Sequence, residues 1–168
     1  MIIVIANVID LLAAGIQVAS GAIRQKAKIL AVQILQLFMQ GVSMLLLGGV
    51  TGAISNLLSC LRNYLSYKDK LNFAWKAMLI GASIAMTLLF NEQGLLGYLP
   101  AAVCTVYILL MDTKDPIKFK WLVTLCFVPW TFYHFVLQSY VGALFDIASI
   151  VSNGITLWLM IAKKNKQT

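Results

Sequence analysis

The chain has 168 residues, of which 61% are hydrophobic and 11% are charged. Soluble domains carry roughly a quarter of their residues as charges, so this composition excludes an ordinary soluble fold and favours a chain that lies in a membrane. The net charge of +7 would suit a nucleic-acid-binding protein. The 13 Lys and Arg residues lie mostly in short breaks between apolar runs, however, which indicates membrane topology and no nucleic-acid partner.

Polar or glycine-rich breaks divide the chain into seven apolar segments, each about the length that crosses ~30 Å of hydrocarbon as a helix. Since backbone groups in lipid must be hydrogen-bonded within their own segment, each segment is expected to be helical. The predicted fold class is therefore all-α, a polytopic membrane protein. The predicted spans cover residues 1–21, 29–48, 50–67, 74–91, 95–111, 119–137 and 140–162.

The first segment ends in small residues, as a signal peptide does before its cleavage site. It has no positive amino-terminal region, and Asp10 lies in its middle. Basic residues follow the segment instead of preceding it. We therefore interpret residues 1–21 as a retained first span.

Positive charge alternates from one predicted connection to the next. Basic clusters follow spans one, three, five and seven, whereas the other connections carry only Glu92 or no charge. Lys and Arg are retained on the cytoplasmic side of a membrane. The pattern predicts a multi-pass membrane protein with its amino terminus outside and its carboxyl terminus in the cytoplasm. The clusters comprise Arg24, Lys26, Lys28, Lys68, Lys70, Lys76, Lys114, Lys118, Lys120, Lys163, Lys164 and Lys166.

A polar pattern occurs twice in the chain, 90 residues apart. Residues 52–63 read GAISNLLSCLRN, and residues 142–153 read GALFDIASIVSN. The same offset pairs the basic turn after span one with the one after span five. Spans one to three are therefore predicted to correspond to spans five to seven, as parallel repeats with a solute site at their interface. The predicted units are a first repeat over 1–67, a linker helix over 68–92 and a second repeat over 93–168.

Polar side chains form stripes along four of the predicted spans. Spacings of three and four residues place the members of each stripe on one helix face. Because polar groups that face lipid are costly, the stripes are expected to face each other or a wet cavity. They are Asn7, Asp10 and Gln17 in span one; Gln33, Gln36 and Gln40 in span two; Asn56, Ser59 and Asn63 in span three; and Asp146, Ser149 and Asn153 in span seven.

Two interpretations of these stripes stay open. Ser, Asn and Gln side chains often tie membrane helices together, at roughly 1 kcal/mol or less per hydrogen bond. Alternatively, the equivalent residues Asn63 and Asn153 form a pair of amides that clamps a neutral polar molecule. The predicted solute-binding residues are Asn63, Asn153, Gln40, Asn56, Ser149 and Trp130, the last because its flat ring could stack on a sugar or heterocycle.

Asp10 and Asp146 are the acids that lie well inside predicted spans. An ionised carboxylate in the membrane costs a few kcal/mol, so each is a candidate for binding a coupling proton or cation. The structural alternative pairs each acid with a neighbouring amide or amine, and Asp146 is close enough to the outer end of its span to meet water. Arg62 lies less than about two helical turns from Lys68, so we expect its side chain to snorkel to the cytoplasmic face.

The sequence gives little support for catalysis. It contains no H-E-x-x-H or G-x-S-x-G motif, no phosphate-cradling loop and no carboxylate pair with acid–base spacing. The cysteines Cys60, Cys104 and Cys126 all lie inside apolar segments and form no C-x-x-C pair, so we interpret them as reduced small hydrophobes. We therefore expect no enzyme activity, no cofactor and no metal.

The stretch LLLGGVTGAISNLLSCLRN, preceded by the basic turn RQKAK, resembles the YgjV family of bacterial inner-membrane proteins. The predicted arrangement of three, one and three helices with an outside amino terminus resembles the SWEET and PQ-loop superfamily of small-solute transporters, whose architecture the PnuC-type carriers share. This superfamily resemblance implies transport. It also implies that an Asn on the third helix of each repeat contacts the solute, and Asn63 and Asn153 match those positions.

The superfamily resemblance further implies helix-bending prolines. Pro129 and Pro100 are the candidate hinges, but their counterparts in the first half, Met39 and Asp10, are not prolines. We therefore expect an asymmetric pair of repeats. The predicted function is a transporter or facilitator for a small, mostly neutral polar solute, with the lipid bilayer as its other partner and a homo-oligomer left open. The alternative is a non-transporting membrane protein that acts as a partner-binding or assembly subunit.

Overall fold

The computed structural model describes residues 2–46, 50–90, 94–136 and 140–165. These residues form seven α-helices and one short 3₁₀ helix and contain no β-strand, so the all-α prediction is confirmed for this part of the chain. Glu92 and Lys166, which contribute to the predicted charge pattern, lie outside it. The helices are α1 (Ile2–Ser20), α2 (Lys26–Leu46), α3 (Val50–Tyr67), α4 (Phe73–Phe90), η1 (Gly94–Tyr98), α5 (Leu99–Leu110), α6 (Pro116–Val136) and α7 (Tyr140–Asn165).

The predicted spans agree with these bounds to within three residues, except at the fifth. There the chain first forms η1, and α5 begins only at Leu99, with Pro100 in its first turn. Proline suits this position because its missing N–H would have no partner in the first turn of a helix. The prediction that Pro100 is a hinge within the fifth span is therefore corrected: Pro100 lies in the first turn of α5. Pro129, by contrast, lies inside α6, as predicted.

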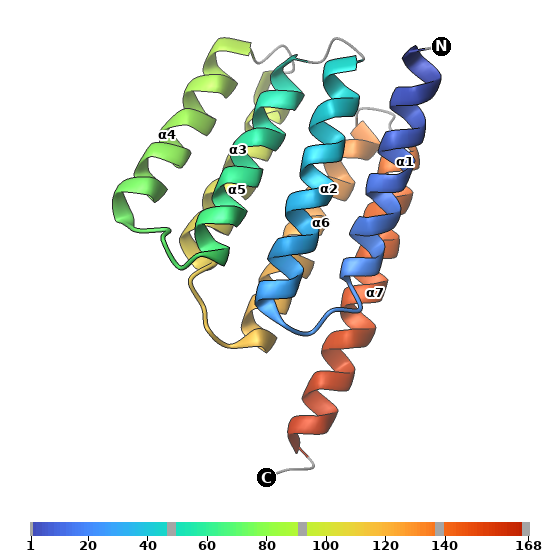
Figure 1. The fold of residues 1–168 in the computed structure, drawn as a ribbon, viewed down its shortest axis with the longest axis vertical. Helices are drawn as coiled ribbons and strands as arrows, with labels where there is room; N and C mark the ends of the chain where they lie inside the picture. The colour runs from blue at the N-terminus through green and yellow to red at the C-terminus, as the bar shows by residue number, and fades with distance from the viewer. Residues whose placement is uncertain (1, 47–49, 91–93, 137–139, 166–168) are drawn as a thin grey trace.

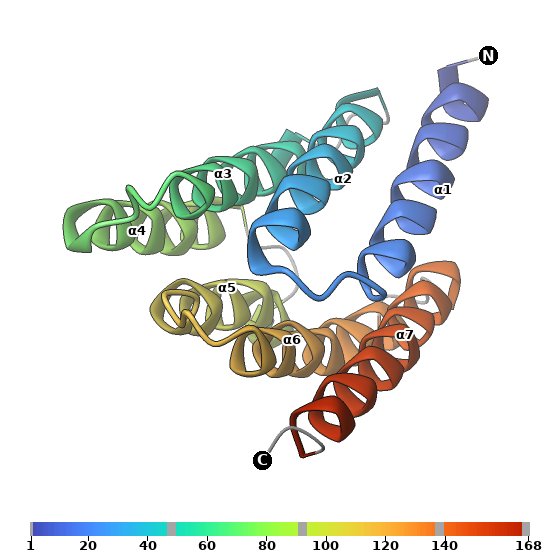
Figure 2. The same cartoon turned by 60° about the horizontal axis from the view of Figure 1, so that its bottom comes forward.

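Neighbouring helices in the sequence are also neighbours in space. Figure 2 shows α1 to α4 in one row and α5 to α7 in a second row beneath it. Contacts between α4 and α5 join the rows at one edge, contacts between α1 and α7 join them at the other, and α2 meets α6 in between. The seven helices thus form a flattened ring whose first and last members touch.

The outside of this ring is apolar, and its inside is unusually polar. Large apolar side chains such as Leu11, Phe38 and Leu88 are exposed, whereas Gln17, Gln36 and Asn63 are buried. This is the reverse of a soluble protein and suits a bundle in lipid. By length and composition, three of the described segments are long and apolar enough to cross a membrane, namely Ile2–Ser20, Phe73–Phe90 and Gly142–Asn165.

Helix boundaries recur at the 90-residue offset of the polar pattern. The ends of α1 and α5, the starts and ends of α2 and α6, and the starts of α3 and α7 all differ by this interval. Such recurrence is expected of two repeats that run in the same direction. The basic residues that follow α1, α3 and α5 and end α7 all lie at one end of the bundle, the lower end in Figure 1, which we call the basic end.

The contact between α1 and α7 depends on a glycine at the end of α1. A Cβ atom built on Gly21 would lie 2.6 Å from the Ser152 Cβ and 2.3 Å from its Oγ, distances that side chains do not tolerate. The Ser152 hydroxyl is itself held in place, because it donates to the Val18 carbonyl at 3.0 Å. The close approach of the two helices therefore requires that residue 21 has no side chain.

We predict that Gly21→Ala destabilises the protein by about 1–3 kcal/mol, because the added methyl group overpacks the contact with Ser152. Gly154→Ala, on α7, is the matched control: a Cβ there meets no atom within 4 Å. Since Ala is favoured over Gly in a helix interior by about 1 kcal/mol, the control is expected to be neutral or stabilising. Denaturation in detergent micelles measures both, and equal stability of the two variants would contradict the prediction.

Candidate functional site

A cluster of hydrogen-bonded polar side chains connects α1, α2 and α7 inside the bundle. The side-chain nitrogen of Gln17 donates to the Asp146 carboxylate at 3.0 Å and to the Ser149 hydroxyl at 3.3 Å. The Gln36 side chain donates to the Gln17 oxygen at 2.9 Å and to the Gln40 oxygen at 3.1 Å. We call these five residues the Gln17 cluster; all are buried except Gln40, which is half-buried.

Gln17 is the centre of this cluster because an amide has both donors and an acceptor. Its donors meet α7 and its acceptor meets α2, so one side chain on α1 ties three helices together. Asp146 is only 4% exposed, which corrects the expectation that it meets water at the end of its helix. The alternative, in which an amide partners this acid, is what the structure shows.

A second cluster connects α2, α3 and α5. The Asn63 side chain donates to the Gln33 oxygen at 3.2 Å, and the Tyr107 hydroxyl donates to the same oxygen at 3.2 Å. The Arg62 Nε donates to the Asn63 oxygen at 3.0 Å, and a terminal guanidinium nitrogen lies 3.5 Å from the Cys104 Sγ. We call Gln33, Arg62, Asn63, Cys104 and Tyr107 the Arg62 cluster.

Arg62 is buried in this cluster, so the prediction that it snorkels to the aqueous face is wrong. Its guanidinium carbon lies 4.4 Å from the centre of the Tyr107 ring, and the residue is only 9% exposed. The side chain extends across to α5 instead of along α3 to water. An aromatic face, an amide oxygen and a thiol replace the water that an exposed guanidinium would bind.

The two clusters share the polar face of α2. Gln33 belongs to the Arg62 cluster and Gln36, one turn away, belongs to the Gln17 cluster. One cluster therefore joins α7, α1 and α2 and the other joins α2, α3 and α5, so each contains residues of both predicted repeats. No buried side-chain nitrogen or oxygen atom of the described residues lacks a hydrogen-bond partner. In this state the amides satisfy one another, and a solute would have to exchange places with these internal bonds.

The two asparagines predicted as a clamp have different partners. Asn63 and Asn153 are 0% and 1% exposed, so both face the interior as expected. Asn153, however, donates to the Ser149 carbonyl of its own helix at 2.8 Å, while Asn63 bonds across to α2. Within the described ranges no recorded hydrogen bond joins the two, and in this state they do not act on one shared group.

The polar stripe of α1 only partly faces the interior. Gln17 is buried, but Asn7 and Asp10 are exposed. The buried stripe of α1 runs through Ala6 and Ala13, and Asp10 lies at its edge. The expectation that the whole stripe faces inward is therefore wrong for its outer half.

The remaining predicted residues lie around the two clusters. Asn56 is half-buried, and its Cβ is the nearest atom, at 3.5 Å, to a Cβ built on Gly41, so it lies where α2 and α3 approach closely. Trp130 is half-buried on α6, directly after Pro129.

Sequence reasoning missed a reciprocal contact at the basic end. The ammonium group of Lys120, on α6, donates to the carbonyls of Ser20 at 3.3 Å and Ile23 at 2.7 Å, in the turn that follows α1. Lys26, on α2, donates to the carbonyls of Met111 and Thr113, in the turn that follows α5. We call this pair the lysine clasp, and Lys120 is fully buried in it.

Two acceptor carbonyls of the clasp are at equivalent positions of the two halves, but its lysine donors are not. Ile23 and Thr113 are equivalent at the 90-residue offset, and each carbonyl accepts from a lysine of the opposite half. The offset indicated that the two turns lie at one end of the bundle, but it pairs Lys26 with Pro116 and Lys120 with Leu30, so it did not point to these donors. We interpreted both lysines only as topology signals.

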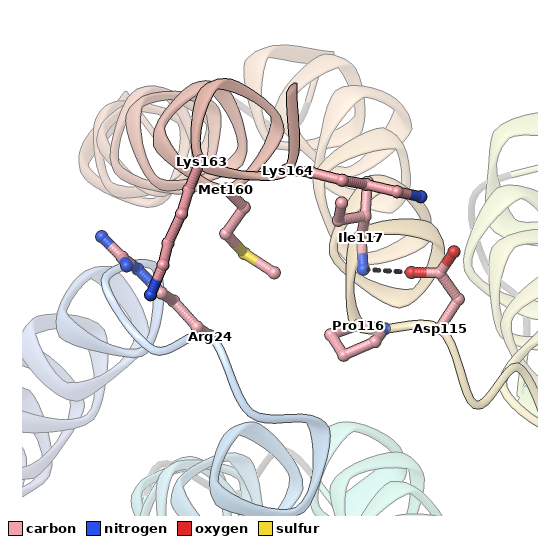
Figure 3. A pocket seen from close by; sticks show the side chains of 7 residues that line it. All are labelled: Arg24, Asp115, Pro116, Ile117, Met160, Lys163 and Lys164. Carbon is pink, nitrogen blue, oxygen red and sulfur yellow. Dashed lines mark hydrogen bonds between the residues drawn. The ribbon is translucent and has the colours of Figure 1, made fainter. Parts of the chain in front are cut away.

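A cavity of about 490 Å³ opens at the basic end. Figure 3 shows its lining, to which the turn after α1, the start of α6 and the end of α7 contribute. It lies apart from the two polar clusters and includes neither Asn63 nor Asn153. Its lining residues are Arg24, Asp115, Pro116, Ile117, Met160, Lys163 and Lys164.

One comparison with known proteins finds a match. A family model, Imp-YgjV, described as bacterial inner membrane protein, matches residues 4–164. This match extends from the first turn of α1 to the last turn of α7, so it covers the whole ring of helices. No curated protein and no solved structure matches the chain.

We predict that Gln17→Leu lowers the free energy of unfolding by about 1–3 kcal/mol, because Asp146 and Gln36 lose their buried partner. Gln40→Leu is the control: Gln40 is half-buried at the end of the cluster and accepts one bond, so a loss of roughly 1 kcal/mol or less is expected. Asp146→Ala should cost less in the Gln17→Leu background than in the wild type. Denaturant titration in micelles measures these values, and additive losses would show that the residues do not act together.

We predict that Lys120→Met increases amide hydrogen exchange in the turn after α1, whereas Lys26→Met increases it in the turn after α5. Each variant removes the donor that holds the carbonyls of the opposite half. Lys118→Met, an exposed residue of the first turn of α6, should change neither turn. Mass spectrometry of peptides covering 18–25 and 108–115 provides the readout. Faster exchange only in the half that carries the substitution would contradict the crossed arrangement.

Proposed function

The chain belongs to the Imp-YgjV family of bacterial inner membrane proteins, and we propose that it is a multi-pass transporter or facilitator for a small, mostly neutral polar solute. The observation that carries this proposal is the run of buried amides and hydroxyls from α7 to α5 through α2. Bonding between helices alone needs isolated pairs of such groups. A continuous interior of amides is what a solute with hydroxyl or amide groups would need.

The chemistry of the clusters narrows the solute class. Gln and Asn offer donors and acceptors without net charge, so they suit sugars, nucleosides and vitamin-like heterocycles. Arg62 adds a fixed positive charge to the Arg62 cluster, which disfavours cationic solutes and favours those with carbonyl or hydroxyl acceptors. Trp130 is proposed to stack on a ring of the solute.

The proposed solute-binding residues are Asn63, Asn56 and Gln40 from the first half, and Asn153, Ser149 and Trp130 from the second. In the state described, Asn63 and Asn153 bond to other groups, and their convergence on one solute requires a different arrangement of the two halves. Pro129 is the proposed hinge for that change, because a proline inside a helix removes one backbone hydrogen bond. Asp146 and Asp10 are proposed to bind a coupling proton or cation.

The lysine clasp gives the proposed mechanism a gate. It ties each half to the opposite turn at the basic end, so that end is closed in this state. The positive-inside rule assigns the basic end to the cytoplasm, with the amino terminus outside and the carboxyl terminus inside. Opening toward the cytoplasm then requires that Lys26 and Lys120 release their carbonyls, as expected of two repeats that rock around a fixed site.

A second candidate function is a partner-binding or assembly subunit that transports nothing. The observation that favours it is the complete pairing of buried polar side-chain atoms in the described residues, together with a cavity that opens away from both clusters. In that case the amides serve only to hold the helices together. The two candidates differ in whether Asn63 and Asn153 affect ligand binding independently of stability.

The test is a thermal-shift screen of the purified protein against sugars, nucleosides, vitamins and amino acids, followed by binding measurements on variants. We predict that Asn63→Ala and Asn153→Ala each weaken binding of an identified ligand about 10- to 100-fold, because solute groups lose a partner in a desolvated site. The double variant should show a non-additive loss. Ser59→Ala, one turn from Asn63, is the control and should bind nearly normally.

Stability distinguishes the two candidates. If the asparagines only tie helices together, any loss of binding should follow the loss of stability, which a melting curve records for each variant. Variants that remain folded and bind as tightly as the wild type would contradict the proposed site.

A further inference from the structure

The cavity at the basic end is lined by residues that have no part in the proposed transport or in the lysine clasp. Cationic side chains enter it from two parts of the chain far apart in sequence: Arg24 from the turn after α1, and Lys163 and Lys164 from the last turn of α7. The remaining lining is mainly apolar, with Met160, Pro116 and Ile117.

Two of these cations line the same side of the cavity. Figure 3 shows the Lys163 side chain extending toward the side from which Arg24 enters, whereas Lys164 extends to the other side. Positive side chains that line one cavity repel each other, and an anion bound between them would offset this repulsion. The acid of the lining, Asp115, does not fill this role, because its carboxylate is on the far side and accepts the Ile117 N–H at 2.8 Å.

Two exposed tryptophans indicate the depth of the cavity relative to the membrane. Trp158 is 69% exposed on α7, just over one turn before Lys163, and Trp121 is exposed on α6, one turn after Ile117. Exposed tryptophan side chains on membrane helices concentrate at the level of the lipid headgroups. The cations of the cavity therefore lie at or just outside the headgroup level, with apolar side chains toward the acyl chains.

We propose that this cavity binds the phosphate of an anionic phospholipid headgroup from the leaflet at the basic end. The phosphate lies between Arg24 and Lys163, and the glycerol and upper acyl chain pack on Met160, Pro116 and Ile117. Arginine can hold two phosphate oxygens at once, and lysine adds a point charge. Basic pockets between helix ends are known to select anionic headgroups in this way. The bound lipid fastens the end of α7 to the turn after α1, whatever the solute.

The test compares two variants of the full chain that each lose two positive charges. Arg24→Gln/Lys163→Gln removes the two cations on one side of the cavity, and Lys68→Gln/Lys70→Gln removes exposed cations of the turn after α3, at the same end of the bundle but outside the cavity. Both are reconstituted in nanodiscs of mixed phosphatidylglycerol and phosphatidylcholine. Native mass spectrometry then measures how much phosphatidylglycerol stays bound to each protein.

We expect the Arg24/Lys163 variant to bind phosphatidylglycerol about 25-fold more weakly than the wild type, roughly fivefold for each charge removed. The Lys68/Lys70 variant should lose at most about twofold, and Lys163→Arg, which keeps both positive charges in the cavity, should bind phosphatidylglycerol like the wild type. Both changed pairs are exposed, and circular dichroism is used to check that each variant is folded. Equal losses in the two double variants would overturn the proposal, because they would show general attraction to surface charge.

A second arm tests the source of the phosphate. Glycerol 3-phosphate and inorganic phosphate are added to the wild type in zwitterionic nanodiscs, where no anionic lipid competes. If the lipid is the ligand, neither should raise the melting temperature at millimolar concentration, whereas phosphatidylglycerol should. Stabilisation by the soluble phosphates that the Arg24/Lys163 variant loses would assign the cavity to a soluble ligand and overturn the lipid proposal. A failure of the solute screen leaves both arms unaffected.

Discussion

Three glutamines on one face of α2 constrain the whole bundle. In hydrocarbon no water can satisfy an amide, so each of Gln33, Gln36 and Gln40 must find a protein partner. Among the described residues, their recorded partners on other helices are three: Gln36 reaches Gln17 on α1, and Gln33 receives bonds from Asn63 on α3 and from Tyr107 on α5. This requirement turns the polar face of α2 toward the inside of the ring, with α1 and α3 on either side and the second row of helices against it. The ring follows from where these amides can be buried.

The first helix of each half faces the third helix of the other half, and these two helix contacts differ. Between α1 and α7, the small residues Gly21 and Ser152 let the helices touch. At the equivalent positions between α5 and α3 the chain has Met111 and Arg62, and the Arg62 side chain bridges to Cys104 and Tyr107 of α5. Positions related by the 90-residue offset thus form a close contact on one side and a contact through a long polar side chain on the other. This difference in side-chain volume adds to the unpaired prolines in making the two halves asymmetric.

Hydrophobicity and charge predict the spans, the all-α fold and the common position of the basic residues, because lipid imposes these features on any sequence. The same rules failed for residues whose position depends on which neighbouring side chain they contact. Arg62 was expected in water, but an arginine can bind an aromatic ring and an amide wherever tertiary packing brings them near. Asp10 has the spacing of a buried residue, yet it lies at the edge of the stripe that α2 and α7 cover. The role of Pro100 could not be predicted, because proline occurs both in the first turn of a helix and at bends inside a helix. The sequence of one helix does not determine which other helix it packs against. Whether Asn63 lies near Asn153 could therefore not be predicted from either helix alone.

The contact between the first and last helices has a consequence for biosynthesis. Gln17 enters the membrane early, but Asp146 and Ser149 arrive only when α7 emerges, about 130 residues later. Until then, among the described residues, Gln36 on the next helix to be made is the recorded side-chain partner of Gln17 that is already in place. The hairpin of α1 and α2 is thus held by an internal amide bond while the ring is still open. Closure waits for the last helix, so the nascent protein passes through an open, C-shaped intermediate whose polar seam faces lipid or an insertion factor. A chain truncated before α7 contains every helix of the first row but lacks the helix that closes the ring.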